Sequence, residues 1–160
     1  CDTKISWSTK PHSSVNVRDL VQQAKSVQPF MVVITGGEPL MHDLEPLTQV
    51  LKQEGLRLHL ETSGAHPFSG RFDWVSLSPK RVKQPQQDIY ACAHELKVVI
   101  ANAEDLVWAE AQAAQVSAST VKLLQPEWTS EQSQQLVFDY VKQHPDWRIS
   151  LQTHKFLGVR

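Results

Sequence analysis

Small, polar and charged residues collect in short strings that each follow an apolar run. The first string, Thr35-Gly36-Gly37-Glu38-Pro39, comes directly after the apolar residues 30–34. Two adjacent glycines let the backbone turn sharply and approach a ligand without a Cβ in the way. Their N–H and C=O groups can then bind an amine or a carboxylate. A bare Gly-Gly is more often a plain turn, but the five-residue string after an apolar run is far more specific.

Four further strings follow other apolar runs. In parallel α/β folds, functional sites form where the strands reach their carboxyl ends. The concentration of polar residues at these positions therefore predicts a binding site. The strings are Glu61-Thr62-Ser63-Gly64, Ser78-Pro79-Lys80, Gln125-Pro126 and Gln152-Thr153-His154-Lys155.

Three residues in or near these strings could be either site residues or structural and surface residues. Glu61 has the opposite parity to Leu58 and Leu60, so it faces the interior of a barrel if the leucines face helices. It is then either a substrate-binding group or a surface charge. Lys97 is open to the same alternatives, of which we favour a structural role. His154 is expected to end a strand beside Gln152, and we interpret it as a substrate contact.

The elements that position these residues follow from the hydrophobic pattern. Runs at 30–34, 56–61, 74–78, 96–100, 121–124 and 148–153 predict six strands. The first run is continuously apolar, which suits a strand buried on both faces. Helical spacing or composition occurs over 17–27, 44–51, 103–114 and 136–141.

The expected helix boundaries come from capping signals. Asp43 is the expected N-cap and Gly55 the expected stop of the second helix, and Thr129 with Gln132 resembles a capping box for the last. The helical signal fails between the second and fourth strands, so 64–71 and 79–92 are expected to be loops or short turns. Strands that alternate with helices predict an α/β fold with a mainly parallel sheet.

Composition limits the class of protein. The 160 residues are expected to form one domain spanning 1–160, with 41% hydrophobic and 21% charged residues. Sixteen Lys plus Arg against seventeen Asp plus Glu leave no basic surplus for nucleic acid. No apolar run reaches the roughly 20 residues of a membrane span. Two cysteines make no disulfide framework, which favours a reducing cytoplasm.

The glycine string resembles the GGE motif of radical S-adenosylmethionine enzymes. With four other strings in order it resembles the 7-carboxy-7-deazaguanine synthase family, from Cys1 to about Leu157. That resemblance implies an incomplete TIM-type barrel of about six mainly parallel strands, with helices outside. The four strings are Cys1-Asp2-Thr3, Glu61-Thr62-Ser63-Gly64, Ser78-Pro79-Lys80 and Ser150-Leu151-Gln152-Thr153-His154-Lys155.

The resemblance also implies an activity. Members of that family convert 6-carboxy-5,6,7,8-tetrahydropterin to 7-carboxy-7-deazaguanine with loss of ammonia, on the path to queuosine. The implied cofactors are a [4Fe–4S] cluster, S-adenosylmethionine and Mg²⁺, and the implied partners are an electron donor such as flavodoxin and a second copy of the chain. A relative without a cluster that keeps the pocket is the alternative. Phosphate chemistry is disfavoured, because no phosphate-cradling Gly-rich loop opens a helix.

The resemblance assigns roles residue by residue. Cys1 would bind the cluster and Thr3 would bind Mg²⁺, with no residue assigned as an acid or base. Thr35, Glu61 and His154 would contact the substrate. The remaining cofactor contacts would be Asp2, Gly36, Gly37, Glu38, Ser78, Pro79, Lys80 and Gln125.

The chain departs from the family pattern at its start. Cys1 resembles the third of three cluster cysteines, so we expect that an N-terminal segment is missing and that these 160 residues alone hold no intact cluster. Cys92 lies far away in sequence, in a different predicted loop, and cannot replace the other two. Cys92-Ala93-His94 could begin a metal site, but a buried cysteine without a ligand is the favoured interpretation.

Overall fold

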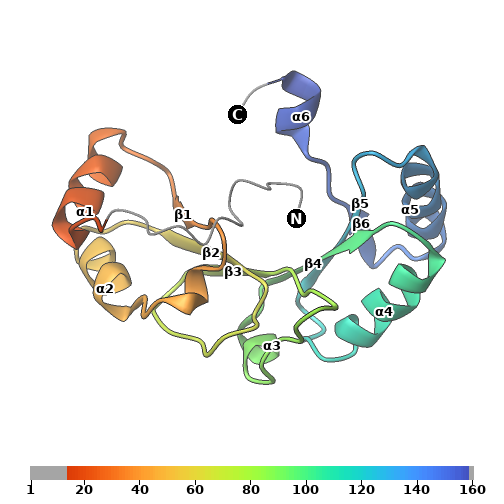
Figure 1. Cartoon of the computed structure of the whole chain (residues 1–160), viewed down its shortest axis with the longest axis horizontal. Coiled ribbons are helices and arrows are strands. Elements are labelled where there is room, and N and C mark those ends of the chain that lie inside the picture. The colour runs from red at the N-terminus through yellow and green to blue at the C-terminus, as the bar shows by residue number, and fades with distance from the viewer. Residues whose placement is uncertain (1–13, 159–160) are drawn as a thin grey trace.

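The computed structural model describes residues 14–158, which form one sheet of six strands in the order β1-β2-β3-β4-β5-β6. Every neighbouring pair is parallel, so strand order follows chain order. Figure 1 shows the sheet bent into an open arc. This is the expected α/β fold of an incomplete barrel. The strands are β1 Val32–Ile34, β2 Leu58–Thr62, β3 Trp74–Leu77, β4 Glu95–Ile100, β5 Val121–Pro126 and β6 Trp147–Ile149.

Helices connect the strands and cover the outer side of the arc. Figure 1 shows α1 to α5 along that side, while α6 lies apart from them across the opening. A short 3-10 helix, η2, follows β1. The bounds are α1 Val17–Ser26, η2 Pro39–Met41, α2 Glu45–Gln53, α3 Ile89–Cys92, α4 Ala103–Ala113, α5 Glu131–Gln143 and α6 Thr153–Leu157.

The two faces of the sheet differ in burial. Leu58 and Leu60 of β2 are fully buried against the outer helices, whereas His59 and Glu61 between them are only partly buried. The same alternation runs along β4, where Leu96 and its outward neighbours are fully buried. Because side chains alternate along a strand, the polar residues share the inner face of the arc. This confirms the predicted orientation of Glu61.

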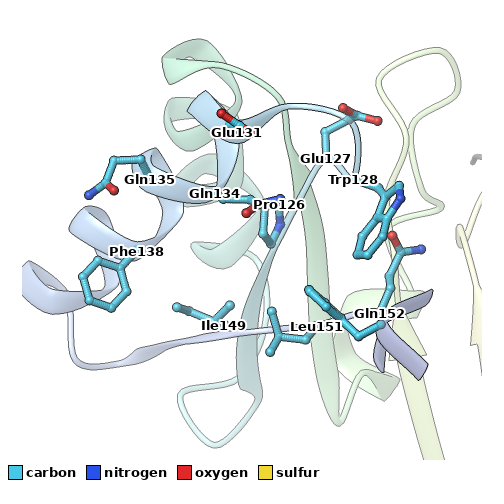
Figure 2. Close-up of a pocket in the computed structure, with 11 residues that line it drawn as sticks. Pro126, Glu127, Trp128, Glu131, Gln134, Gln135, Phe138, Ile149, Leu151 and Gln152 are labelled. Carbon is cyan, nitrogen blue, oxygen red and sulfur yellow. The ribbon is translucent and has the colours of Figure 1, made fainter. Parts of the chain in front are cut away.

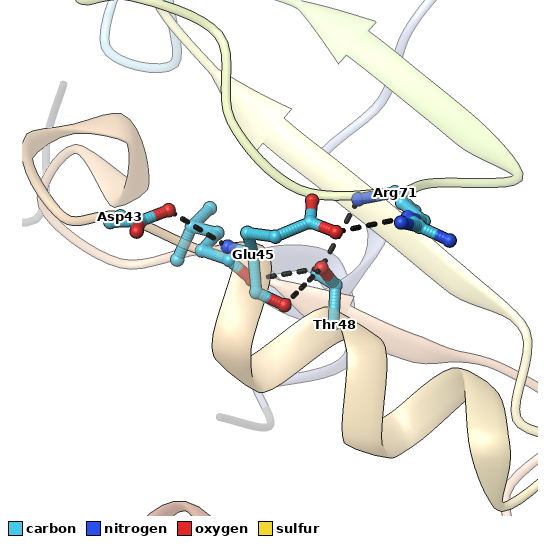
Figure 3. Close-up of polar contacts among 5 residues, drawn as sticks. Asp43, Glu45, Thr48 and Arg71 are labelled. Carbon is cyan, nitrogen blue, oxygen red and sulfur yellow. Dashed lines mark hydrogen bonds and ion pairs between the residues drawn. The ribbon is translucent and has the colours of Figure 1, made fainter.

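Polar contacts at the start of α2 join that helix to the loop before β3 (Figure 3). The hydroxyl of the buried Thr48 donates to the carbonyl of Leu44 at 2.8 Å and accepts from the backbone N–H of Arg71 at 3.1 Å. Arg71 Nε also donates to Glu45 Oε1 at 3.0 Å. The expected N-cap, Asp43, lies one residue too early. Leu44 is the N-cap, and Asp43 accepts from the backbone N–H of Glu45 instead.

The first strand is less buried than its apolar sequence predicted. Val33 is 48% exposed and Phe30, 79% exposed, lies outside the strand. Within the described residues β1 pairs with β2 alone, so it is an edge strand whose inner face meets the opening of the arc. A continuous apolar run specifies a strand but not the position of that strand in the sheet.

Two other predicted boundaries were wrong. Ser130, not Thr129, caps α5 by accepting from the backbone N–H of Ser133, and Thr129 donates to Glu127. The last strand ends at Ile149 rather than at residue 153, and a short helix, α6, follows it. The predicted loop 79–92 contains the four-residue helix α3, which is too short to give a periodic signal.

In the part of the chain that the structure describes, no helix is long and apolar enough to cross a membrane.

A substitution in the outer layer of β4 tests the core. Leu96 is fully buried in the main apolar cluster, so Leu96→Ala should lower the free energy of unfolding by about 2–5 kcal/mol. Val107 on α4 is 74% exposed, so Val107→Ala should change it by less than about 0.5 kcal/mol. Urea unfolding measures both. Equal effects of the two substitutions would contradict the assigned core.

Candidate functional site

The glycine string after β1 is anchored by Glu38. The Glu38 carboxylate accepts from the hydroxyl of Thr62, from both the hydroxyl and the backbone N–H of Ser63, and from the backbone N–H of Leu40. These contacts join the loop after β1 to the end of β2. Glu38 therefore sets the position of Gly36 and Gly37 relative to the second strand.

Hydrogen bonding keeps Glu38 ionised. Burial on its own would raise the pKa of Glu38, but the hydrogen bonds from Ser63, Thr62 and the backbone outweigh it and hold the pKa below the ordinary 4.5. Beside it, Gly36 has a φ of +131°, a conformation that L side chains rarely adopt, and a Cβ there would meet no atom within 4 Å. The space beside Gly36 is therefore open.

A charged pair spans the middle of the inner face. Glu61 on β2 lies 3.5 Å from Lys97 Nζ on β4, and the Thr35 hydroxyl donates to the other carboxylate oxygen at 3.4 Å. Lys97 is more deeply placed, with 20% of its side chain exposed. The structure thus brings together two predicted substrate contacts, Thr35 and Glu61, with a lysine that was expected to be structural.

A second set of polar residues lies on the same face, next to this charged pair. His59 Nε2 is 2.8 Å from the hydroxyl of Ser76, which donates to Glu95 at 2.9 Å. Burial is the main cause that lowers the pKa of His59; Lys97 acts in the same direction, while Glu61 and Glu95 oppose it. The sequence analysis assigned no role to this trio, although their strand parity matches that of Glu61 and Lys97.

The string after β3 forms the next part of the site. Lys80 Nζ donates to the Ser78 hydroxyl at 2.9 Å. Burial is the main cause that lowers the pKa of Lys80; Lys97 adds to it, and Glu38 and Glu61 oppose it. These four charged side chains come from four neighbouring strands, β1 to β4, or from the loops that follow them. A cavity of about 150 Å³ lies here, lined by Pro79, Lys80, Arg81, Val99, Asp105 and Trp108.

A larger cavity lies away from these residues. It measures about 490 Å³ and lies between α5, the end of β6 and α6 (Figure 2). Its wall is mainly apolar, with Phe138, Ile149 and Leu151, and it includes Pro126 and Gln152 from two of the predicted strings. We place the site at the smaller cavity and the inner face, because the charged and hydrogen-bonding groups converge there.

Several predicted site residues lie elsewhere or outside the description. His154 was expected at the end of a strand, but it lies exposed on α6. Gln125 lies on β5 beside Val99 of β4, on the inner face. Cys1, Asp2 and Thr3 lie outside the described residues. Within 14–158 no group of three His, Cys, Asp or Glu residues could hold a metal ion.

The parallel sheet, its polar inner face and the glycine turn define a partial α/β barrel of the radical S-adenosylmethionine type. No protein-family profile matches the chain. The chain is 56% identical over 160 residues to the 7-carboxy-7-deazaguanine synthase of Synechocystis sp., covering 100% of this chain and 77% of that protein. It is 46% identical to the synthase of Flavobacterium psychrophilum, covering 99% and 76% of the two chains.

A solved structure agrees with these relatives. The crystal structure of QueE from Escherichia coli matches with a TM-score of 0.77 at 27% identity, covering 94% of this chain and 72% of that chain. The chain belongs to the 7-carboxy-7-deazaguanine synthase family.

The Glu38 contacts predict a pH-dependent contribution to stability. The pKa of Glu38 is lower in the folded protein than its ordinary value of 4.5. The Glu38 carboxylate therefore stabilises the folded state fully at pH values above 4.5, and this stabilisation is lost as the pH falls through the lowered pKa. Glu38→Gln should therefore cost about 1–3 kcal/mol at neutral pH and less in acid. Urea unfolding of both proteins from about pH 7 down to about pH 3 measures the difference.

The control for that series is Glu54→Gln. Glu54 pairs with Lys25 on the outer helices, where both side chains are well exposed, so its loss should cost less than about 1 kcal/mol at neutral pH. A cost for Glu38→Gln that stays constant from neutral to acid pH would show that the carboxylate does not act in its ionised form.

Proposed function

We propose that this protein catalyses the ring contraction of 6-carboxy-5,6,7,8-tetrahydropterin to 7-carboxy-7-deazaguanine with loss of ammonia. It would then be a carbon–nitrogen lyase. We further propose that it acts in the cytoplasm and that residues 1–160 form one domain. The observation that carries the proposal is the 56% identity to a 7-carboxy-7-deazaguanine synthase over all 160 residues. The resemblance in the five sequence strings supports the same reaction.

The described residues fit an S-adenosylmethionine site. The backbone at Gly36 and Gly37 is exposed and can meet the amino and carboxylate groups of a ligand, while Ser78 and Lys80 offer a hydroxyl and an ammonium group at the end of the next strand but one. We assign Pro79 and Gln125 to the same site, with Asp2 beside it. When bound to a reduced [4Fe–4S] cluster, S-adenosylmethionine supplies the radical that the ring contraction requires.

Glu61 and Thr35 fit a pterin. Glu61 lies beside Lys97 and presents carboxylate oxygens, which can accept hydrogen bonds from the N–H groups along the edge of a pterin ring. The Thr35 hydroxyl already contacts that carboxylate and lies at the end of β1. We assign substrate contact to these two residues and to His154, and Mg²⁺ ligation to Thr3. Flavodoxin as electron donor and a homodimer complete the proposal.

The direct test is conversion of the pterin by the purified protein in a form that carries three cluster cysteines, Cys1 and two supplied upstream of it. Under anaerobic conditions with S-adenosylmethionine, Mg²⁺ and a reductant, mass spectrometry should detect 7-carboxy-7-deazaguanine and release of ammonia. Binding of the pterin without product, in a protein that holds no iron or sulfide, would instead identify a relative that kept the pocket and lost the chemistry.

Glu61→Gln tests the substrate assignment. Loss of the charge should reduce kcat/KM by about 10- to 100-fold, since a hydrogen bond to a charged group contributes about 1.5–3 kcal/mol. Glu54→Gln removes a carboxylate on the outer helices and should leave kcat/KM within about twofold. Equal kcat/KM values for the two variants would contradict the assignment of Glu61 as a substrate contact.

Two cysteine variants test the cluster assignment. In a protein that supplies two further cluster cysteines upstream of Cys1, Cys1→Ala should abolish the iron–sulfur absorbance and the reductive cleavage of S-adenosylmethionine, because a cubane needs three protein thiolates to leave one iron open. Cys92 lies partly buried on α3, and Cys92→Ala should change neither reading. If Cys92→Ala removes the cluster, then Cys92 is a ligand and the assignment of Cys1 as a cluster ligand must be revised.

A further inference from the structure

The trio of His59, Ser76 and Glu95 lies beside the charged pair that we assign to the substrate site. Strand register places Ser76 between the two acids, since Glu61 of β2 pairs with Ser76 of β3, and Ser76 pairs with Glu95 of β4. Register partners share a face of the sheet, so all three side chains belong to the inner face. Glu61 and Glu95 are therefore two carboxylates on either side of one serine.

The direction of the hydrogen bonds follows from the proton count of Ser76. Ser76 is 1% exposed, and its hydroxyl carries a single proton. That proton is donated to Glu95 Oε1 at 2.9 Å, because an ionised carboxylate can only accept. The contact of 2.8 Å with His59 Nε2 must then be a donation from the imidazole. The geometry thus assigns the proton of a neutral His59 to Nε2.

Lys97 has two possible carboxylate partners. It lies two residues after Glu95 on β4, so both side chains leave the same face of the same strand. In the structure Lys97 pairs with Glu61, while Glu95 accepts from Ser76. A partly buried carboxylate without a partner is costly, so an unsatisfied Glu95 would compete for the ammonium group.

We propose that Ser76, oriented by His59, is a positioning residue that satisfies Glu95 and so leaves Lys97 paired with Glu61. The Glu61 carboxylate is then held in place for the pterin, a step that rests on the function proposed above. The arrangement of the five side chains does not depend on that function. Ser76 is 1% exposed, so in this role it acts through Glu95 and Lys97.

Substitution of Ser76 tests the proposal through substrate affinity. In Ser76→Ala, Glu95 should draw Lys97 away from Glu61, and KM for the pterin should rise about tenfold while kcat stays within about twofold. The double variant Ser76→Ala/Glu95→Gln removes the competing charge and should restore KM to within about threefold of the wild-type value. A double variant no better than Ser76→Ala would overturn the proposal, because a packing role predicts additive damage.

Ser133→Ala is the matched control. Ser133 is a fully buried serine whose hydroxyl donates to the carbonyl of Ile100, and it lies on α5, outside the sheet. Its loss should lower stability and leave KM unchanged. A rise in KM equal to that of Ser76→Ala would show that any lost buried hydroxyl has this effect, and it would contradict the proposal.

Two measurements need no activity. Nitrogen NMR of the wild-type imidazole should show the Nε2–H tautomer of His59, and the Nδ1–H tautomer would overturn the proposed orientation even if Ser76→Ala fails to fold. A crystal structure of Ser76→Ala should show Lys97 paired with Glu95, and an unchanged pair with Glu61 would refute the proposal. If the Nε2–H tautomer and the new Lys97–Glu95 pair are both observed while the wild-type protein makes no 7-carboxy-7-deazaguanine, the proposed function is wrong and the role of Ser76 stands.

Discussion

The strict alternation of side chains along β2, β3 and β4 is the constraint on which the rest of this structure depends. Leu58, Leu60 and Leu96 are fully buried on the outer face, and their burial drives helices onto that side of the sheet. The residues between them must then face inward. Because the arc is open, that inner face can carry histidine, glutamate and lysine without burying them completely. The site is a direct consequence of the packing on the other face.

Charges on the inner face are stable because each has a partner. Glu61 pairs with Lys97, and Glu95 accepts from Ser76. Lys80 contacts the hydroxyl of Ser78 and interacts with Glu38 and Glu61. Partly buried charges of one sign alone would be costly, so the alternation of acids and lysines across neighbouring strands keeps the face polar and ordered. A polar ligand can bind to such a face while the charged side chains stay hydrated.

Glu38 shows how one motif residue serves the fold and the site together. Its position after Gly36 and Gly37 was visible in sequence, and it was assigned to cofactor binding. In the structure its carboxylate accepts hydrogen bonds from the end of β2, so the acid holds the glycine turn where a ligand could reach it. Sequence identified the residue, but the partners that define its action come from a strand more than twenty residues away.

The sequence by itself determined the α/β class, the number of strands and the inward face of Glu61, because alternation and turn residues are local signals. Tertiary structure decided that β1 is an edge strand, that residues 153–157 are helical and that Lys97 pairs with Glu61. It also brought His59, Ser76 and Glu95 together. Such outcomes depend on which strands become neighbours and in which register, and that is set by the packing of the whole chain.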